Sequence, residues 1–168
     1  MDALVYVSPA AIAGFIVLLS AAAISDVRSL TIPNAYCLGI VLCYPFFVLG
    51  SPQPVDWSGA LLVSAGLLAV GFVLFTTGRV GGGDAKLLAA TSLWAGPGLL
   101  TEFVLLTAVA GGGIALLLYI RHRWARSPSL AALSGGEASP DFAQQPMPYG
   151  AAIFAGGVYV AFTLLGLV

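Results

Sequence analysis

Charge is what this chain has least of. Only 8% of its 168 residues are charged, six of them Lys or Arg and seven Asp or Glu, and the net charge is −1. A balance so close to zero offers no basic surface for nucleic acid. With 60% hydrophobic residues and a mean hydropathy of +1.02, the composition also excludes an ordinary soluble domain. It predicts an all-α integral membrane protein in a lipid bilayer.

Histidine and cysteine are nearly absent as well. The single histidine, His122, sits between two arginines and has no second histidine with which to share a metal. Cys37 and Cys43 lie six residues apart in an apolar run and form no CxxC pair, which argues against a zinc or redox site. We therefore expect no metal and no cofactor, and we interpret the cysteines as small buried hydrophobic residues.

Long apolar runs fill most of the chain. Because a span needs about 20 apolar residues, the length allows about six transmembrane helices in a single polytopic domain, residues 1–168. We expect helices at 7–25, 34–49, 57–77, 84–95, 99–120 and 149–168, and a cytoplasmic loop at 121–148. Asp56 or Ser58 should cap the third helix. Several glycines are interpreted as close-packing positions between helices: Gly66, Gly71, Gly111 to Gly113, Gly156 and Gly157.

The cations have a consistent distribution in this arrangement. Threading six helices back and forth places all of them on one side of the membrane: Arg28, Arg79, Lys86, Arg121, Arg123 and Arg126. By the positive-inside rule that side is cytoplasmic, so both chain termini are expected outside. Trp57 and Trp94 then fall near the outer interface, where an aromatic belt would lie.

Two acids reach the same depth on the cytoplasmic side. Asp84 follows three glycines at a helix start, where capping and the helix dipole favour a negative charge. Asp26 lies at a helix end, where an acid opposes the dipole and loses solvation. The purely structural alternatives are a helix cap for Asp84 and a solvated loop residue paired with Arg28 for Asp26. If the two acids converge in a low dielectric, they should share one proton, as aspartic proteolysis requires.

These acids lie in two sequence motifs. Asp26-Val27-Arg28 is followed by Ile32-Pro33-Asn34, and further along the chain comes Gly81-Gly82-Gly83-Asp84-Ala85-Lys86. In this combination, and across essentially the whole chain, the sequence resembles the prepilin peptidases, which are intramembrane aspartic proteases of the GxGD type. Pro148-Tyr149-Gly150 is a looser match to the opening of that family's last helix.

The resemblance implies roles for named residues. Asp26 and Asp84 match the catalytic aspartates, and Gly81 and Gly83 match the glycines of the GxGD motif. The neighbouring motif residues are expected to support the site: Lys86, Arg28, Pro33 and Asn34. The reaction needs no metal ion.

The resemblance also implies a substrate and a location. The family cleaves type IV prepilins, between a basic leader and a hydrophobic helix, at the cytoplasmic side of the bacterial inner membrane. Larger members carry paired CxxC motifs and N-methylate the new pilin N-terminus. This chain has neither motif, so it resembles the short form associated with Flp or tight-adherence pili, and we expect no methyltransferase activity. The expected partners are the prepilin, lipid and the pilus assembly machinery.

Two other classes of function stay open from the sequence. A small transporter could use both acids to relay a proton or bind a cation, although transporters usually place such acids near the midplane and often contain repeats. An inert assembly factor of the pilus apparatus would tolerate replacement of both aspartates. A cleavage assay distinguishes these readings.

Overall fold

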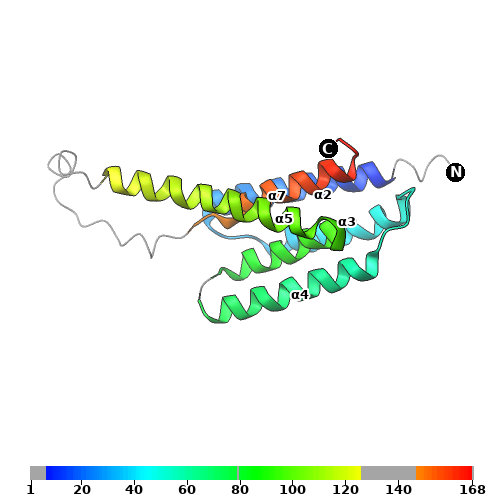
Figure 1. Cartoon of the computed structure of the whole chain (residues 1–168), viewed down its shortest axis with the longest axis horizontal. Helices are drawn as coiled ribbons and strands as arrows, with labels where there is room; N and C mark the ends of the chain where they lie inside the picture. The colour runs from blue at the N-terminus through cyan, green and yellow to red at the C-terminus, as the bar shows by residue number, and fades with distance from the viewer. Residues whose placement is uncertain (1–6, 79, 126–146, 168) are drawn as a thin grey trace.

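The computed structural model describes residues 7–78, 80–125 and 147–167, and every regular element in this part of the chain is a helix. The helices are α2 (Val7–Ser29), α3 (Asn34–Gly50), α4 (Trp57–Thr76), α5 (Gly82–Ala125) and α7 (Tyr149–Leu164). They pack along one another as an elongated bundle (Figure 1). The all-helical prediction is confirmed. Arg79, Arg126 and residues 126–146 of the expected loop lie outside the described residues, as do both chain ends.

Helix α5 is continuous along the chain but reverses direction in space. Gly96 has φ 56° and ψ −170°, so the helix is interrupted there, just before Pro97. This positive φ is readily adopted only by glycine. Figure 1 shows the chain turning back at this point, so the two halves of α5 run in opposite directions. The sequence predicted this interruption, between helices at 84–95 and 99–120.

The second half of α5 is longer than expected. It continues to Ala125, so residues 121–125, which were expected in the loop, are helical. The first helix also extends further, to Ser29 rather than residue 25, whereas the last ends at Leu164 rather than residue 168. Residues 26–29 and 121–125 contain no proline or glycine, so no local signal ends either helix at the residue that we expected.

Three helices are long and apolar enough to cross a membrane by length and composition: Val7–Ser29, Trp57–Thr76 and Gly82–Trp124. The last of these includes the reversal at Gly96. Helices α3 and α7 have 17 and 16 residues. At about 1.5 Å per residue, each of them is slightly shorter than the roughly 30 Å thickness of the hydrocarbon core. The structure therefore has five described helices with three candidate spans, and the count of six spans stays a prediction.

The first half of α5 lies in the interior of the bundle and carries its aromatic core. Trp94 is 2% exposed and stacks on Phe15 of α2 with ring centroids 4.5 Å apart. Two rings of α3, Tyr44 and Phe47, lie 5.7 and 5.4 Å from the Trp94 ring. The indole N–H of Trp94 donates to the carbonyl oxygen of Ile40 at 3.1 Å. The prediction that Trp94 belongs to an aromatic belt that faces lipid is therefore wrong, because protein surrounds this helix segment, and its depth in the membrane stays a prediction.

Close packing explains only some of the glycines. A Cβ on Gly71 would lie 2.8 Å from the Cβ of Ala85, and one on Gly156 would lie 2.9 Å from the carbonyl oxygen of Phe103. At these positions only glycine allows the helices to approach so closely. The interpretation is wrong for three other glycines, because no atom of the described part of the chain lies within 4 Å of the added Cβ: Gly66, Gly112 and Gly113.

Asp56 caps α4, as predicted. Its Oδ1 accepts hydrogen bonds from the Gly59 backbone N–H at 2.9 Å and from the Ser58 hydroxyl at 3.0 Å. These bonds stabilise the ionised carboxylate, with the Gly59 bond contributing most, and hold the pKa of Asp56 below its usual range. This cap lies at the start of α4 beside the turn at Pro97, since a Cβ on Gly59 would lie 2.7 Å from Pro97 Cγ.

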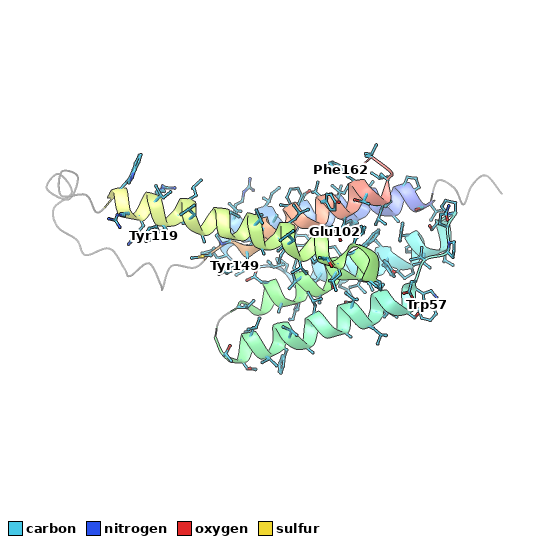
Figure 2. All side chains as sticks on the ribbon, in the orientation of Figure 1. Trp57, Glu102, Tyr119, Tyr149 and Phe162 are labelled. Carbon is cyan, nitrogen blue, oxygen red and sulfur yellow. The ribbon has the colours of Figure 1, made fainter. Side chains whose placement is uncertain are left out.

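The aromatic core predicts a large effect of Trp94→Ala. This substitution removes three ring contacts and a buried hydrogen bond, so the free energy of unfolding should fall by roughly 3–5 kcal/mol. The control is Trp57→Ala, because Trp57 is 56% exposed at the start of α4 (Figure 2). Thermal unfolding of both variants in detergent micelles measures the difference. Equal melting temperatures for the two would contradict the packing described for Trp94.

Candidate active site

Asp26 lies in the last turn of α2 and is 4% exposed. The helix ends at Ser29 because Leu30 adopts the left-handed conformation, with φ 53°, while its N–H donates to the Asp26 carbonyl at 2.8 Å. Pro33, with φ −58°, then precedes the first residue of α3. Asp26 was expected to begin this turn. It is helical instead, so its carboxyl group is directed into the bundle rather than into a solvated loop.

The Asp26 carboxylate has a specific partner at the start of another helix. The backbone N–H of Gly150 donates to Asp26 Oδ2 at 2.7 Å. Gly150 is the second residue of α7, and the first N–H groups of a helix have no acceptor within it. The positive end of the α7 dipole also favours a negative charge here. The start of α7 therefore compensates for the unfavourable position of Asp26 at the end of α2.

Sequence reasoning missed this role of Gly150, which it noted only within a loose motif match. The structure explains why the position needs glycine. A Cβ on Gly150 would lie 2.8 Å from Asp26 Oδ2 and 2.9 Å from Asp26 Cβ, closer than side-chain atoms approach. The available signal was a glycine at the second position of a helix, where an anion can approach the backbone.

Asp84 lies in the first turn of α5, and the two motifs meet there. A Cβ on Gly83 would lie 3.1 Å from the Cβ of Ile32, which belongs to the connection after α2. A Cβ on Gly81 would lie 2.7 Å from Asp84 Oδ2. Glycine at position 83 thus lets the α2–α3 connection lie directly on the turn that carries Asp84, and glycine at position 81 leaves room for the Asp84 carboxylate.

A second contact joins the same two motifs. The Lys86 ammonium group donates to Asn34 Oδ1 at 3.0 Å, and both side chains lie at the surface. Hydrogen bonds from a charged donor are stronger than neutral ones, so this contact helps to fix the start of α3 against the start of α5. Arg28, in the last turn of α2, is exposed.

The two carboxyl groups lie near the same helix start. Asp26 accepts from Gly150, while Asp84 shares a cavity with the adjacent Tyr149. Asp84 Oδ1 is buried and has no hydrogen-bond partner among the described residues. Because a buried carboxylate oxygen without a partner is unfavourable, this atom is available to a proton, a water molecule or a substrate group.

A cavity of about 250 Å³ adjoins Asp84. Its walls come from three helical segments that are far apart in sequence: the first half of α5, the second half of α5 and the start of α7. Figure 2 shows Tyr149 where α7 begins, beside the second half of α5. Most of the lining side chains are apolar, and Gly111 and Gly112 add bare backbone. The site therefore combines a pair of acids with an adjoining apolar cavity.

The contact between Asp26 and α7 predicts that Gly150→Ala is destabilising. The added methyl group would overlap the Asp26 side chain, so α7 must shift and its hydrogen bond to Asp26 must lengthen. We expect a loss of about 1–3 kcal/mol in the free energy of unfolding. Gly113→Ala is the matched control, because nothing lies within 4 Å of the added methyl there. A Gly150→Ala protein as stable in detergent as Gly113→Ala would show that the two helices are not in contact.

The family of the chain follows from a comparison with known families. A model of the type IV leader peptidase family matches residues 13–116, more than half of the chain. The match includes Asp26 and Asp84, whereas Gly150 lies beyond it. No curated protein and no solved structure matches the chain. The family match agrees with the resemblance found in the sequence motifs. This chain is a member of the type IV leader peptidase family.

Proposed function

We propose that this protein is an aspartic prepilin leader peptidase in which Asp26 and Asp84 form the catalytic pair. Family membership supports a peptidase that acts on type IV leader sequences. The observation that carries the aspartic mechanism is the convergence of the two carboxyl groups, one bonded to the start of α7 and one lining the cavity beside it. A buried acid pair of this kind has no evident structural purpose, because each acid costs solvation.

The proposed reaction uses a water molecule held between the two carboxyl groups. One carboxylate takes a proton from this water while the other carboxyl donates its proton to the oxygen of the scissile carbonyl. The water oxygen bonds to the carbonyl carbon and gives a gem-diol. The C–N bond then breaks while the newly protonated carboxyl gives its proton to the nitrogen that becomes the pilin N-terminus, and the other carboxylate takes a proton from one diol hydroxyl. The pair again holds one proton. The Gly150 N–H supports this chemistry because it orients the Asp26 carboxylate and stabilises its charge.

In this proposal the supporting residues hold Asp26 and Asp84 in position and take no direct part in the reaction. Gly83 permits the close approach of the two motifs, and Gly81 leaves room for the Asp84 carboxylate. Pro33 precedes α3, and Asn34 binds Lys86, so the connection after Asp26 is held against the turn before Asp84. We assign these four residues, Lys86 and the nearby Arg28 to positioning rather than to chemistry.

The charge distribution supports a cytoplasmic active site in the bacterial inner membrane. Arg28 lies in the last turn of α2 and Lys86 in the first turns of α5, close to the acid pair. Figure 1 shows that α4 begins and α7 ends at the opposite end of the bundle, where Asp56 caps α4. By the positive-inside rule the end with the cations faces the cytoplasm. The start of α2 lies where α4 begins and α7 ends, away from the cations, which supports the placement of both termini outside.

The substrate class follows from the motifs and from the cysteine content. The sequence as given contains two cysteines and no CxxC pair, which supports the short form of the family. We therefore propose prepilins of the Flp type as substrates, with cleavage after the basic leader and without N-methylation of the product.

Lipid surrounds the helices in this arrangement, since exposed apolar side chains such as Leu62, 76% exposed on α4, would otherwise face water.

The proposal predicts that Asp26→Asn and Asp84→Asn each abolish cleavage. Asparagine keeps the shape of the side chain but can neither accept the proton from water nor deliver one, so the rate should fall at least about 100-fold. The assay is co-expression with an Flp-type prepilin, with the precursor and mature bands read on a gel and the new N-terminus by mass spectrometry. Asp56→Asn is the control, because that carboxylate caps α4 at the opposite end.

The outcomes separate the candidate functions. Accumulation of precursor with either Asn variant, alongside cleavage by wild type and Asp56→Asn, supports the pair. If both Asn variants still cleave, the aspartic mechanism is wrong and the acids have structural roles. If wild type cleaves no prepilin tested, the substrate class is wrong. Mass spectrometry of the product also tests methylation, since an added methyl group on the new N-terminus would contradict the expected absence of methyltransferase activity.

A further inference from the structure

The cavity beside Asp84 extends mainly in one direction from that acid, although Val80 lines it on the other side. Leu88 lies one helical turn beyond Asp84, and Thr107 lies one turn from Gly111. Because the two halves of α5 run in opposite directions, both steps lead toward the turn at Gly96 and away from the cation-bearing end. Ile153 is likewise one turn further along α7 than Tyr149. Apart from the wall at Val80, the cavity therefore runs from Asp84 toward the turn at Gly96, which is the membrane side.

The lining of the cavity selects for an apolar occupant. Leu88, Ala108, Ala152 and Ile153 form much of its walls beside the hydroxyl of Thr107, and no basic side chain lines it among the described residues. The one carboxylate in this described lining is that of Asp84, so an anionic group that entered would lose its hydration without gaining a counter-ion. The volume of about 250 Å³ corresponds to on the order of eight water molecules at roughly 30 Å³ each. This is room for one large apolar side chain.

Resting on the proposed function, we propose that this cavity is the specificity pocket for the first residue of the mature pilin. An occupant that touches Asp84 must adjoin the scissile bond. An occupant on the membrane side of that bond belongs to the hydrophobic pilin helix, whereas the basic leader lies on the cytoplasmic side. The pocket thus binds the side chain that follows the cleaved bond and selects it by size and hydrophobicity.

Gly112 offers a way to fill the pocket without disturbing the fold. It lines the cavity, and no atom lies within 4 Å of a Cβ placed on it. The next residue, Gly113, is equally open but does not line the cavity. Both glycines lie in the same half of α5, so leucine at either position changes the helix propensity equally. Gly112→Leu and Gly113→Leu therefore form a matched pair.

The experiment measures cleavage of a prepilin series in which only the first mature residue changes, to Gly, Ala, Leu, Phe or Asp. Wild type should cleave the Leu and Phe substrates at least tenfold faster than the Asp substrate. Gly112→Leu should cleave the Leu and Phe substrates at least tenfold more slowly than wild type does. Its cleavage rates on the Gly and Ala substrates should stay within about threefold of wild type. Gly113→Leu should match wild type on the whole series.

The opposite wall gives a second, independent variant. Leu88→Ala enlarges the pocket on the side of the first half of α5. The ratio of the cleavage rate of the Phe substrate to that of the Ala substrate should rise at least fivefold over the wild-type ratio. Leu88 is half-buried and packs against the core that contains Trp94, so thermal unfolding of Leu88→Ala in detergent is measured beside its cleavage profile.

The result that overturns the inference is a Gly112→Leu profile that parallels wild type or Gly113→Leu across the series, or a loss of equal size on every substrate. Wild-type preference for Asp at the first mature position would overturn it too. These outcomes leave the proposed function standing, because wild-type cleavage and its loss in Asp84→Asn are read in the same assay. Absence of wild-type cleavage on the whole series would instead remove the proposed function, and this inference with it.

Discussion

The hydrogen bond from the Gly150 N–H to the Asp26 carboxylate is the contact on which the candidate site depends. A carboxylate buried at the end of a helix is unfavourable both for its solvation and for its interaction with the helix dipole. The start of α7 offsets both effects, because it supplies a free N–H and the positive end of a second dipole. This places α7 against α2, requires glycine at position 150, and brings Tyr149 and Ile153 to the cavity beside Asp84.

The rest of the bundle determines what lies next to this contact. The reversal at Gly96 returns the second half of α5 alongside the first, which places Gly111 and Gly112 opposite Asp84. The aromatic core around Trp94 holds the first half of α5 between α2 and α3, so the turn that carries Asp84 has a fixed support. The connection after α2 then packs on this turn through Ile32, and its position is reinforced from outside by Lys86.

Much of the fold could be predicted from local signals in the sequence. Apolar run length predicted helices, a glycine-proline pair predicted the interruption of α5, and an aspartate before a helix predicted the cap at Asp56. The presence of two acids at one end followed from counting helices. The partner of Asp26 could not be predicted in this way, because Gly150 is 124 residues away and no local pattern joins the two.

The burial of Trp94 and the openness of Gly112 were missed for a related reason. In a helical bundle within a membrane, the side chains that face lipid and those that face protein are both apolar. Hydropathy therefore does not tell which face of a helix is covered by other helices. Trp94 was therefore assigned to an interface and Gly112 to a helix contact, whereas the first is enclosed and the second borders a cavity. Such assignments need the three-dimensional arrangement of the helices.

The central claim is that the two acid-bearing motifs are in contact, and a cysteine cross-link tests it most directly. In a chain with Cys37 and Cys43 replaced by Ala, we would introduce Ile32→Cys and Gly83→Cys, since these Cβ positions lie 3.1 Å apart, near the roughly 3.8 Å of a disulfide. The account predicts rapid disulfide formation in oxidised membranes, read by mass spectrometry, and none between Ile32→Cys and Gly66→Cys. Failure of the first pair to cross-link, or equal cross-linking by both, would contradict it.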